Sequence, residues 1–187
     1  MPSEYTRAAL ESVSSYPLSS VAAGHVVPIL AMVQVAVSAT DCDVTFSSFY
    51  RDPAANAAAG GSKFSDHLSG QCLDYVPDTL SVEDFARRLV AAHAREGNGA
   101  WWGQLIVYPY DSRPHIHESL AGASWRYGEI LVAVASGKYV AWDGVGPVPE
   151  SQMTANLSNV DDQGIIPPLL VVAGVLFLVW LFILRGS

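Results

Sequence analysis

Two short stretches of the sequence carry the residues that decide its fold and chemistry: Ser65-Asp66-His67-Leu68-Ser69-Gly70-Gln71-Cys72-Leu73-Asp74 and Pro114-His115-Ile116-His117-Glu118-Ser119. In a strand, alternate side chains point to one face, so His115 and His117 can address one point in space. A turn at Gly70 can bring His67 and Asp74 back together. Two imidazoles and one carboxylate would leave a zinc ion an open fourth position for water, as in catalytic sites. The alternative is that such paired histidines are ordinary surface or core residues.

Hydrophobic patterning around these stretches predicts a mixture of helices and strands. The segment from His25 to Ala39 is predicted as a helix with Pro28 in its first turn. We interpret its apolar part as a core helix rather than a signal sequence, because Pro28 and Gln34 interrupt it. Further helices are expected over residues 5–15, 52–61 and 81–97, with Ser81 as an N-cap, and strands over 43–50, 101–108, 115–120, 130–135 and 139–142.

The composition excludes some classes of protein. Half of the 187 residues are hydrophobic, which argues against disorder, and the formal net charge of -8 leaves no surplus of cations for a phosphate backbone. We therefore expect no nucleic-acid partner. Two cysteines, Cys42 and Cys72, are too few for a disulfide framework.

Much of the apolar character lies at the C-terminal end. Residues Ile165–Leu184 include no charge, and 17 of these 20 residues are hydrophobic. A helix of this length approaches the roughly 30 Å hydrocarbon core of a bilayer. The expected organisation is a domain at 1–144, a linker at 145–164 and a hydrophobic anchor helix at 165–185. A buried helix within a larger assembly is the alternative reading of the last segment.

The first stretch resembles the SxHxxGxAxD signature of the zinc D-Ala-D-Ala carboxypeptidases and L-alanyl-D-glutamate endopeptidases, the VanY-like family. Cys72 takes the place of the alanine in that signature. Neighbouring segments resemble the family's other motifs: Phe49–Pro53 is similar to SGYRSP, Asn56–Ser62 to NxxxGGS, and Gln104–Val107 followed by His115–His117 to the closing QLIxE and HxH block. The resemblance covers roughly residues 20–120, and the phage and prophage members look most similar.

This resemblance implies a fold and a set of roles. The fold is the α+β Hedgehog/D,D-peptidase type, a small antiparallel sheet with flanking helices, to which this chain adds its C-terminal helix. Zinc would be held by His67, Asp74 and His117. Arg51 would steady a substrate carbonyl or carboxylate, and it offers a fixed fork of donors for that role. The family also implies that Ser65 contacts substrate and that His115 supports the transition state.

Simpler roles for some of these residues remain open at this level. Arg51 can instead form a structural salt bridge, and Ser65 can be a turn residue that bonds its own backbone. Cys72 is interpreted as a small buried hydrophobe rather than a thiolate ligand, with pairing to Cys42 as an alternative.

The sequence also departs from the family pattern. Pro114 stands where many members carry a general-base glutamate, and Tyr108 stands where a glutamate often ends the preceding strand. His115 is then the expected base or electrostatic partner, because imidazole changes its charge near neutral pH.

Together these observations predict a zinc-dependent peptidase that hydrolyses an amide bond in the peptidoglycan stem peptide. The alternative is a weak or inactive relative with a structural or wall-binding role in a virion. An anchor without an evident export signal favours a phage-encoded or prophage-encoded product acting in wall penetration or lysis. We expect it to lie in a virion or in the host inner membrane and envelope, held through Ile165–Leu184 by lipid or by apolar packing in a virion assembly.

Overall fold

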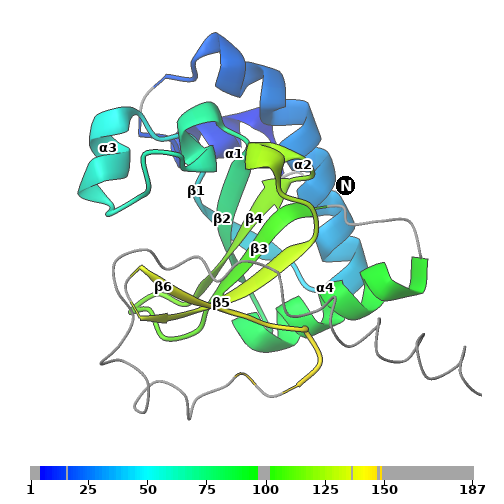
Figure 1. The fold of residues 1–187 in the computed structure, drawn as a ribbon. Coiled ribbons are helices and arrows are strands. Elements are labelled where there is room, and N and C mark those ends of the chain that lie inside the picture. Colours follow the sequence, from blue (N-terminus) through cyan, green and yellow to red (C-terminus); the bar gives the residue numbers. More distant parts are fainter. Residues whose placement is uncertain (1–4, 16, 97–101, 136, 147, 149–187) are drawn as a thin grey trace, which may run out of the picture. The chain divides into compact units, whose positions relative to one another are not determined.

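The computed structural model describes residues 5–15, 17–96, 102–135, 137–146 and 148 (Figure 1). The helical segments in this part of the chain are α1 (Arg7–Ser12), α2 (Ser20–Thr40), α3 (Pro53–Ala58), η1 (Asp66–Ser69), α4 (Val82–Glu96) and η2 (Ala123–Trp125). The strands are β1 (Val44–Ser48), β2 (Cys72–Pro77), β3 (Trp102–Tyr108), β4 (His115–Leu120), β5 (Glu129–Ala135) and β6 (Lys138–Ala141). The α+β class expected from the sequence is thus observed.

The six strands form one sheet in the order β1-β2-β4-β3-β5-β6 (Figure 1). Every neighbouring pair is antiparallel except β3 and β5, which are parallel. The expectation of a purely antiparallel sheet is therefore wrong at one pair. The physical reason is that the chain reverses after β4 and crosses to the far side of β3, so that β5 runs in the same direction as β3.

The two long helices, α2 and α4, pack together and cover one face of the sheet (Figure 1). Leu73 and Tyr75 alternate onto that face from β2, and the ring of Tyr75 contacts that of Phe85 on α4 at 5.6 Å between centroids. Ile116 of β4 joins the same core. Because side chains alternate, Asp74 and His117 must point to the opposite face. The helices thus fix one side of the sheet as core and leave the other for the site.

Helix α2 begins five residues earlier than the hydrophobic pattern predicts. The Ser19 hydroxyl caps it by accepting a hydrogen bond from Ala22 N at 3.1 Å. Pro28 consequently lies inside the helix and not in its first turn, which corrects that expectation. The side chains of Ile29 and Val33 are fully buried in the core, in line with the interpretation of this segment as a core helix.

The predicted N-cap of helix α4, Ser81, is confirmed. Ser81 Oγ accepts a hydrogen bond from Asp84 N at 3.1 Å, and Glu83 and Asp84 lie in the first turn, where acidic side chains favour the helix dipole. The predicted hairpin is also present as β5 and β6. The sequence patterns missed η2, and they also missed η1 and β2, because the polar residues of 65–74 break the alternation that marks a strand.

The predicted C-terminal anchor at 165–185 lies outside the described residues, as does most of the predicted linker at 145–164. Among described residues, α2 is the one helix long and apolar enough to span a membrane, with a mean hydropathy of 1.8. A core helix and a signal sequence meet the same criterion. The domain boundaries at 144 and 164 stay predictions.

Candidate metal centre

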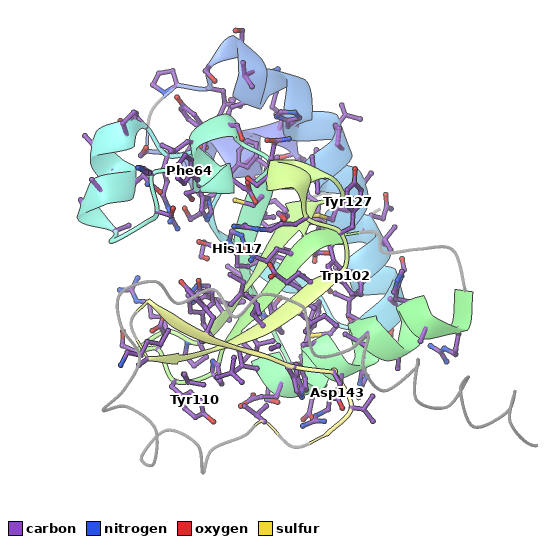
Figure 2. All side chains as sticks on the ribbon, in the orientation of Figure 1. Phe64, Trp102, Tyr110, His117, Tyr127 and Asp143 are labelled. Atoms are coloured by element: carbon purple, nitrogen blue, oxygen red, sulfur yellow. The ribbon has the colours of Figure 1, made fainter. Side chains whose placement is uncertain are left out.

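The centre of the candidate site is a pair of residues facing each other across β2 and β4. Asp74 and His117 are direct Cα partners in this antiparallel pair, and His117 Nδ1 lies 2.8 Å from Asp74 Oδ1. Figure 2 shows His117 near the middle of the sheet. Both side chains are buried, Asp74 at 5% and His117 at 8% exposure. The strand register therefore places one carboxylate and one imidazole together without any loop being needed.

The second imidazole comes from η1, the short helical turn before β2. His67 Nδ1 lies 2.6 Å from the backbone carbonyl oxygen of Phe49, which can only accept, so Nδ1 carries the hydrogen. The other ring nitrogen, Nε2, faces Asp74 Oδ2 at 3.1 Å. The rings of His67 and His117 meet edge to face with centroids 5.1 Å apart. Residues 67, 74 and 117, which the family resemblance marks as zinc ligands, thus converge in the structure.

Gly70 allows η1 to hold His67 in this place. The residue has a φ of +66°, in the left-handed region, and ends the turn. A Cβ at this position would lie 2.8 Å from the Cβ of Ala22 and 3.0 Å from its Cα. The glycine of the sequence motif is therefore required both by its backbone conformation and by the close approach of α2.

Arg51 also reaches the carboxylate of Asp74. Its Nη2 lies 2.5 Å from Asp74 Oδ2, and its Nε donates to Ser48 Oγ at 2.8 Å. The backbone N–H of Arg51 donates to the carbonyl oxygen of His67 at 3.1 Å. The salt bridge that the sequence analysis gave as the alternative role of Arg51 is therefore present. Its partner is Asp74, so the salt bridge lies inside the site. Nη1 takes part in neither of the two side-chain bonds, so one arm of the guanidinium remains available for a ligand.

The electrostatics of Asp74 match a cation site. Burial alone would raise the pKa of this carboxyl, but the charges and hydrogen bonds of His67 and His117 outweigh burial and hold the pKa well below its ordinary value. Asp74 is thus a buried carboxylate that needs positive charge around it.

The donor set fits a zinc ion. With Nδ1 of His67 protonated, a neutral ring would turn the Nε2 lone pair toward Asp74. The Asp74 carboxylate lies 3.1 Å from Nε2 of His67 and 2.8 Å from Nδ1 of His117, and these three side chains form a ligand set that a divalent cation would satisfy. The family-implied metal is thus compatible with the residues present.

Cys72 is a component of the site that the sequence analysis interpreted as a simple hydrophobe. Its Sγ and ring nitrogens of His67 and His117 all lie within 4.8 Å of one another. It is fully buried and is a free cysteine, as is Cys42, so the alternative of a disulfide is wrong. Burial raises the pKa of the Cys72 thiol, and the nearby carboxylates of Asp74 and Asp66 raise it further. One feature of the sequence could have indicated this placement of Cys72. It lies two residues before Asp74, so both side chains point to the same face of β2.

His115 lies on the same face of β4 as His117 but has other partners. Its ring stacks on that of Tyr108 with centroids 4.3 Å apart and planes 9° from parallel. Its Nδ1 lies 3.0 Å from the carbonyl oxygen of Arg113 and 3.7 Å from Asp111 Oδ2. Since Nδ1 donates to that carbonyl, Nε2 is the nitrogen that can accept a proton. Burial raises the pKa of Tyr108, so this tyrosine is neutral and cannot replace the missing glutamate as a base.

Ser65 acts as the N-cap of η1 in the structure. Its Oγ accepts a hydrogen bond from His67 N at 3.4 Å, and the side chain is half-buried. The turn role and the substrate role are compatible with this place, two residues before the proposed ligand His67. Phe64, which is 71% exposed, projects from the preceding loop (Figure 2).

A second cluster of polar residues, around Asp66 of η1, was not predicted from the sequence. Asp66 is 3% exposed, and its Oδ1 accepts a hydrogen bond from the hydroxyl of Ser124. Arg126 Nη1 lies 3.7 Å from Asp66 Oδ2 and donates to Gln104 Oε1 at 2.9 Å. These contacts tie η1 to η2 and β3. They help to fix the position of His67, the residue next to Asp66.

Glu118 lies on the core face of the sheet. This is expected because it follows His117, which points to the site face. It is 1% exposed, and its Oε2 accepts a hydrogen bond from Tyr75 at 2.8 Å. Burial raises its pKa to about 7, against which the Tyr75 hydrogen bond acts. Glu118 therefore does not supply the missing general base on the site face.

Comparison with known proteins identifies the family. A family model described as Peptidase M15 matches residues 7–107, more than half of the chain. The matched range includes Arg51, His67 and Asp74 and ends before β4. No curated protein and no solved structure gave a match. The motif at 65–74, the convergence of His67 and His117 on Asp74, and the matched range together show that this chain belongs to the Peptidase M15 family.

Proposed function

We propose that this protein is a zinc-dependent peptidoglycan peptidase that hydrolyses an amide bond of the stem peptide, in the VanY-like manner. The observation that carries the proposal is the buried Asp74 carboxylate, which lies within 3.1 Å of one imidazole nitrogen from His67 and one from His117. M15 membership supports a metallopeptidase, and the finer choice of substrate rests on the sequence resemblance.

The ligands proposed for the zinc ion are His67, Asp74 and His117. When bound, such an ion polarises a carbonyl and lowers the pKa of coordinated water toward about 7. The protein contributes orientation: the Phe49 carbonyl fixes the ring of His67, and the β2–β4 register fixes Asp74 opposite His117. Such outer contacts hold metal ligands in place.

Arg51 and His115 are proposed to act on the substrate. The free arm of the Arg51 guanidinium can bind a carboxylate or a developing oxyanion, since the other contacts of the side chain hold it beside Asp74. His115 can take a proton at Nε2, because its Nδ1 is committed to the Arg113 carbonyl. Tyr108 stacks on this imidazole and holds its plane.

The test is hydrolysis of purified peptidoglycan by the full chain loaded with zinc. We expect release of new amino groups, with mass spectrometry of the muropeptides identifying the bond that is cut. His67→Ala and Asp74→Ala should lose zinc and activity together. His93→Gln, on α4 and away from the site, is the matched control and should retain both. A His67→Ala protein that cleaves at the wild-type rate without zinc would contradict the proposal.

A second function is favoured by two residues. Pro114 stands where many family members carry a general-base glutamate, and Tyr108 stands where a glutamate often ends the strand, which supports an inactive structural or wall-binding protein of a virion. The same assay separates the two functions, because binding to peptidoglycan without release of amino groups would support the second one alone.

The proposed biological setting is a phage or prophage product, with 165–184 as a membrane anchor or an apolar contact in a virion assembly. The uncharged apolar run supports this part of the proposal. Detection of the chain in purified particles would support a virion-borne enzyme. Absence from particles, with release of wall fragments at lysis, would support a lysis enzyme instead.

A further inference from the structure

We propose that Cys72 is a fourth protein ligand of the metal ion, so that this chain holds the ion with His67, Cys72, Asp74 and His117. This inference rests on the proposed function only in requiring that an ion binds at the site. The family signature has an alanine at this position, so a cysteine ligand would be an addition to the ligands that the resemblance implies.

The position of Cys72 in the sheet places its sulfur beside the other proposed ligands. Cys72 and Asp74 are alternate residues of β2 and point to the same face, and each lies opposite a residue of β4 on that face, Ser119 and His117 respectively. The sulfur of Cys72 and the imidazole nitrogens lie within 4.8 Å of one another. Ligand atoms sharing one tetrahedral zinc are separated by roughly 3.5 Å, given bonds of about 2.0–2.3 Å. Small side-chain rotations would bring the sulfur into the ligand shell.

The two cysteines differ in the partners of their sulfur atoms. The sulfur of Cys42 is engaged with the backbone oxygen of Asp43 and the hydroxyl of Thr79, both at 3.3 Å. Among the described residues, no hydrogen bond uses the sulfur of Cys72, although that side chain is fully buried. One ring nitrogen of His67 and one of His117 lie within 4.8 Å of it. The Cys72 sulfur is therefore available to an ion, and the Cys42 sulfur is not.

The charge of a bound divalent ion would also favour a thiolate ligand. A divalent ion bound by two neutral imidazoles and the Asp74 carboxylate keeps a net positive charge in a buried place. A thiolate is a strong zinc ligand and would neutralise this charge, the thiol proton passing to solvent.

A chemical consequence distinguishes this site from its three-ligand relatives. Structural zinc sites are closed by four protein ligands, whereas catalytic sites keep one position open for water. Cys72 would compete with water for that position. We therefore expect Cys72→Ala to bind metal more weakly but to cleave peptidoglycan faster than the wild-type chain.

The deciding experiment uses Co²⁺ as the probe in the full-length protein, because thiolate ligation gives cobalt an intense near-ultraviolet charge-transfer absorption. We expect this band in the wild type and in Cys42→Ala, and its loss in Cys72→Ala. A zinc competition titration should show the affinity of Cys72→Ala falling by at least the roughly 10-fold that loss of a supporting contact costs. Cys72→Ala is a small change and restores the family residue, and thermal unfolding checks that it folds.

The outcomes separate this inference from the proposed function. Cobalt bound with visible d–d bands but without the thiolate band would overturn Cys72 ligation and leave the peptidase proposal standing. The thiolate band together with absent hydrolysis, in both the wild type and Cys72→Ala, would support Cys72 ligation and contradict the peptidase. A wild-type chain that binds neither cobalt nor zinc would overturn both.

Discussion

Tyr108 and His115 are direct partners across β3 and β4, and their rings stack almost parallel at 4.3 Å between centroids. The tyrosine hydroxyl lies 3.3 Å from that of Tyr139 on β6, so the stack is held from a third strand. The imidazole of His115, which is proposed to accept a proton, is thus held in place by Tyr108, which in turn contacts Tyr139. Tyr108 therefore positions His115, although it stands where a glutamate often ends this strand in the family.

Substitution of Tyr108 tests this positioning role. Tyr108→Ala removes the stack, and we expect kcat to fall by about 10-fold or more, since misplaced catalytic groups are costly. Tyr108→Phe retains the ring and should retain most of the activity. The pH profile of kcat/KM should shift in Tyr108→Ala but not in Tyr108→Phe. Equal losses in the two variants would point to the hydroxyl instead of the stack.

Arg51 is expected to matter more to activity than any other arginine of the domain. Arg51→Gln removes the positive charge beside Asp74 and the arm available to substrate. We expect kcat/KM to fall by roughly 10²–10³-fold, as for loss of an oxyanion donor. Arg88→Gln, which removes a donor to the Thr40 carbonyl on the helix side, is the control and should change kcat/KM little. A near-normal Arg51→Gln enzyme would restrict this residue to a structural salt bridge.

Gly70 is expected to be intolerant of a side chain. Gly70→Ala places a non-glycine residue at φ +66° and a Cβ against Ala22. Gly137→Ala is a matched control, because Gly137 has a φ of +68° with nothing within 4 Å of its Cβ position. We expect Gly137→Ala to cost about 1–2 kcal/mol and Gly70→Ala about 1–3 kcal/mol more. Denaturant unfolding measures both, and equal losses would exclude the contact with α2 as a cause.

The raised pKa of Glu118 predicts that the stability of the metal-free protein depends on pH. The folded state keeps the Glu118 proton up to about pH 7, whereas the unfolded chain releases it near 4.5. Between these values the unfolded state binds fewer protons, so the free energy of unfolding falls as pH rises, by about 3 kcal/mol in total. The loss is complete above about pH 7. Glu118→Gln cannot titrate, and the difference in unfolding free energy between the two proteins should follow this course.

Much of the fold was predictable because its elements follow simple periodicities. The strand at 115–120 has the predicted bounds, and the helix after Ser81 has the predicted cap. The parallel pairing of β3 with β5 was not predictable, since it depends on where the chain crosses after β4 and not on local residue patterns. Strand β2 was missed because polar Asp74 interrupts an otherwise apolar run.

The candidate site was predictable in part, for a related reason. His67, Asp74 and His117 could be grouped by their motif, and the register of β2 with β4 brings them together. The bond from Arg51 to Asp74 and the place of Cys72 depend on three-dimensional packing across three segments. The spacing of two between Cys72 and Asp74 indicates a shared face only once residues 72–77 are known to form a strand, and that strand was not predicted.

The two outer strands of the sheet have a consequence for self-association. β6 is only four residues long and begins with Lys138, and β1 carries an irregularity between Phe46 and Ser48. Short length, an edge lysine and a bulge each disfavour the addition of a further strand from another molecule. Aggregation through edge-to-edge pairing of these two strands is therefore disfavoured, even when the protein is concentrated.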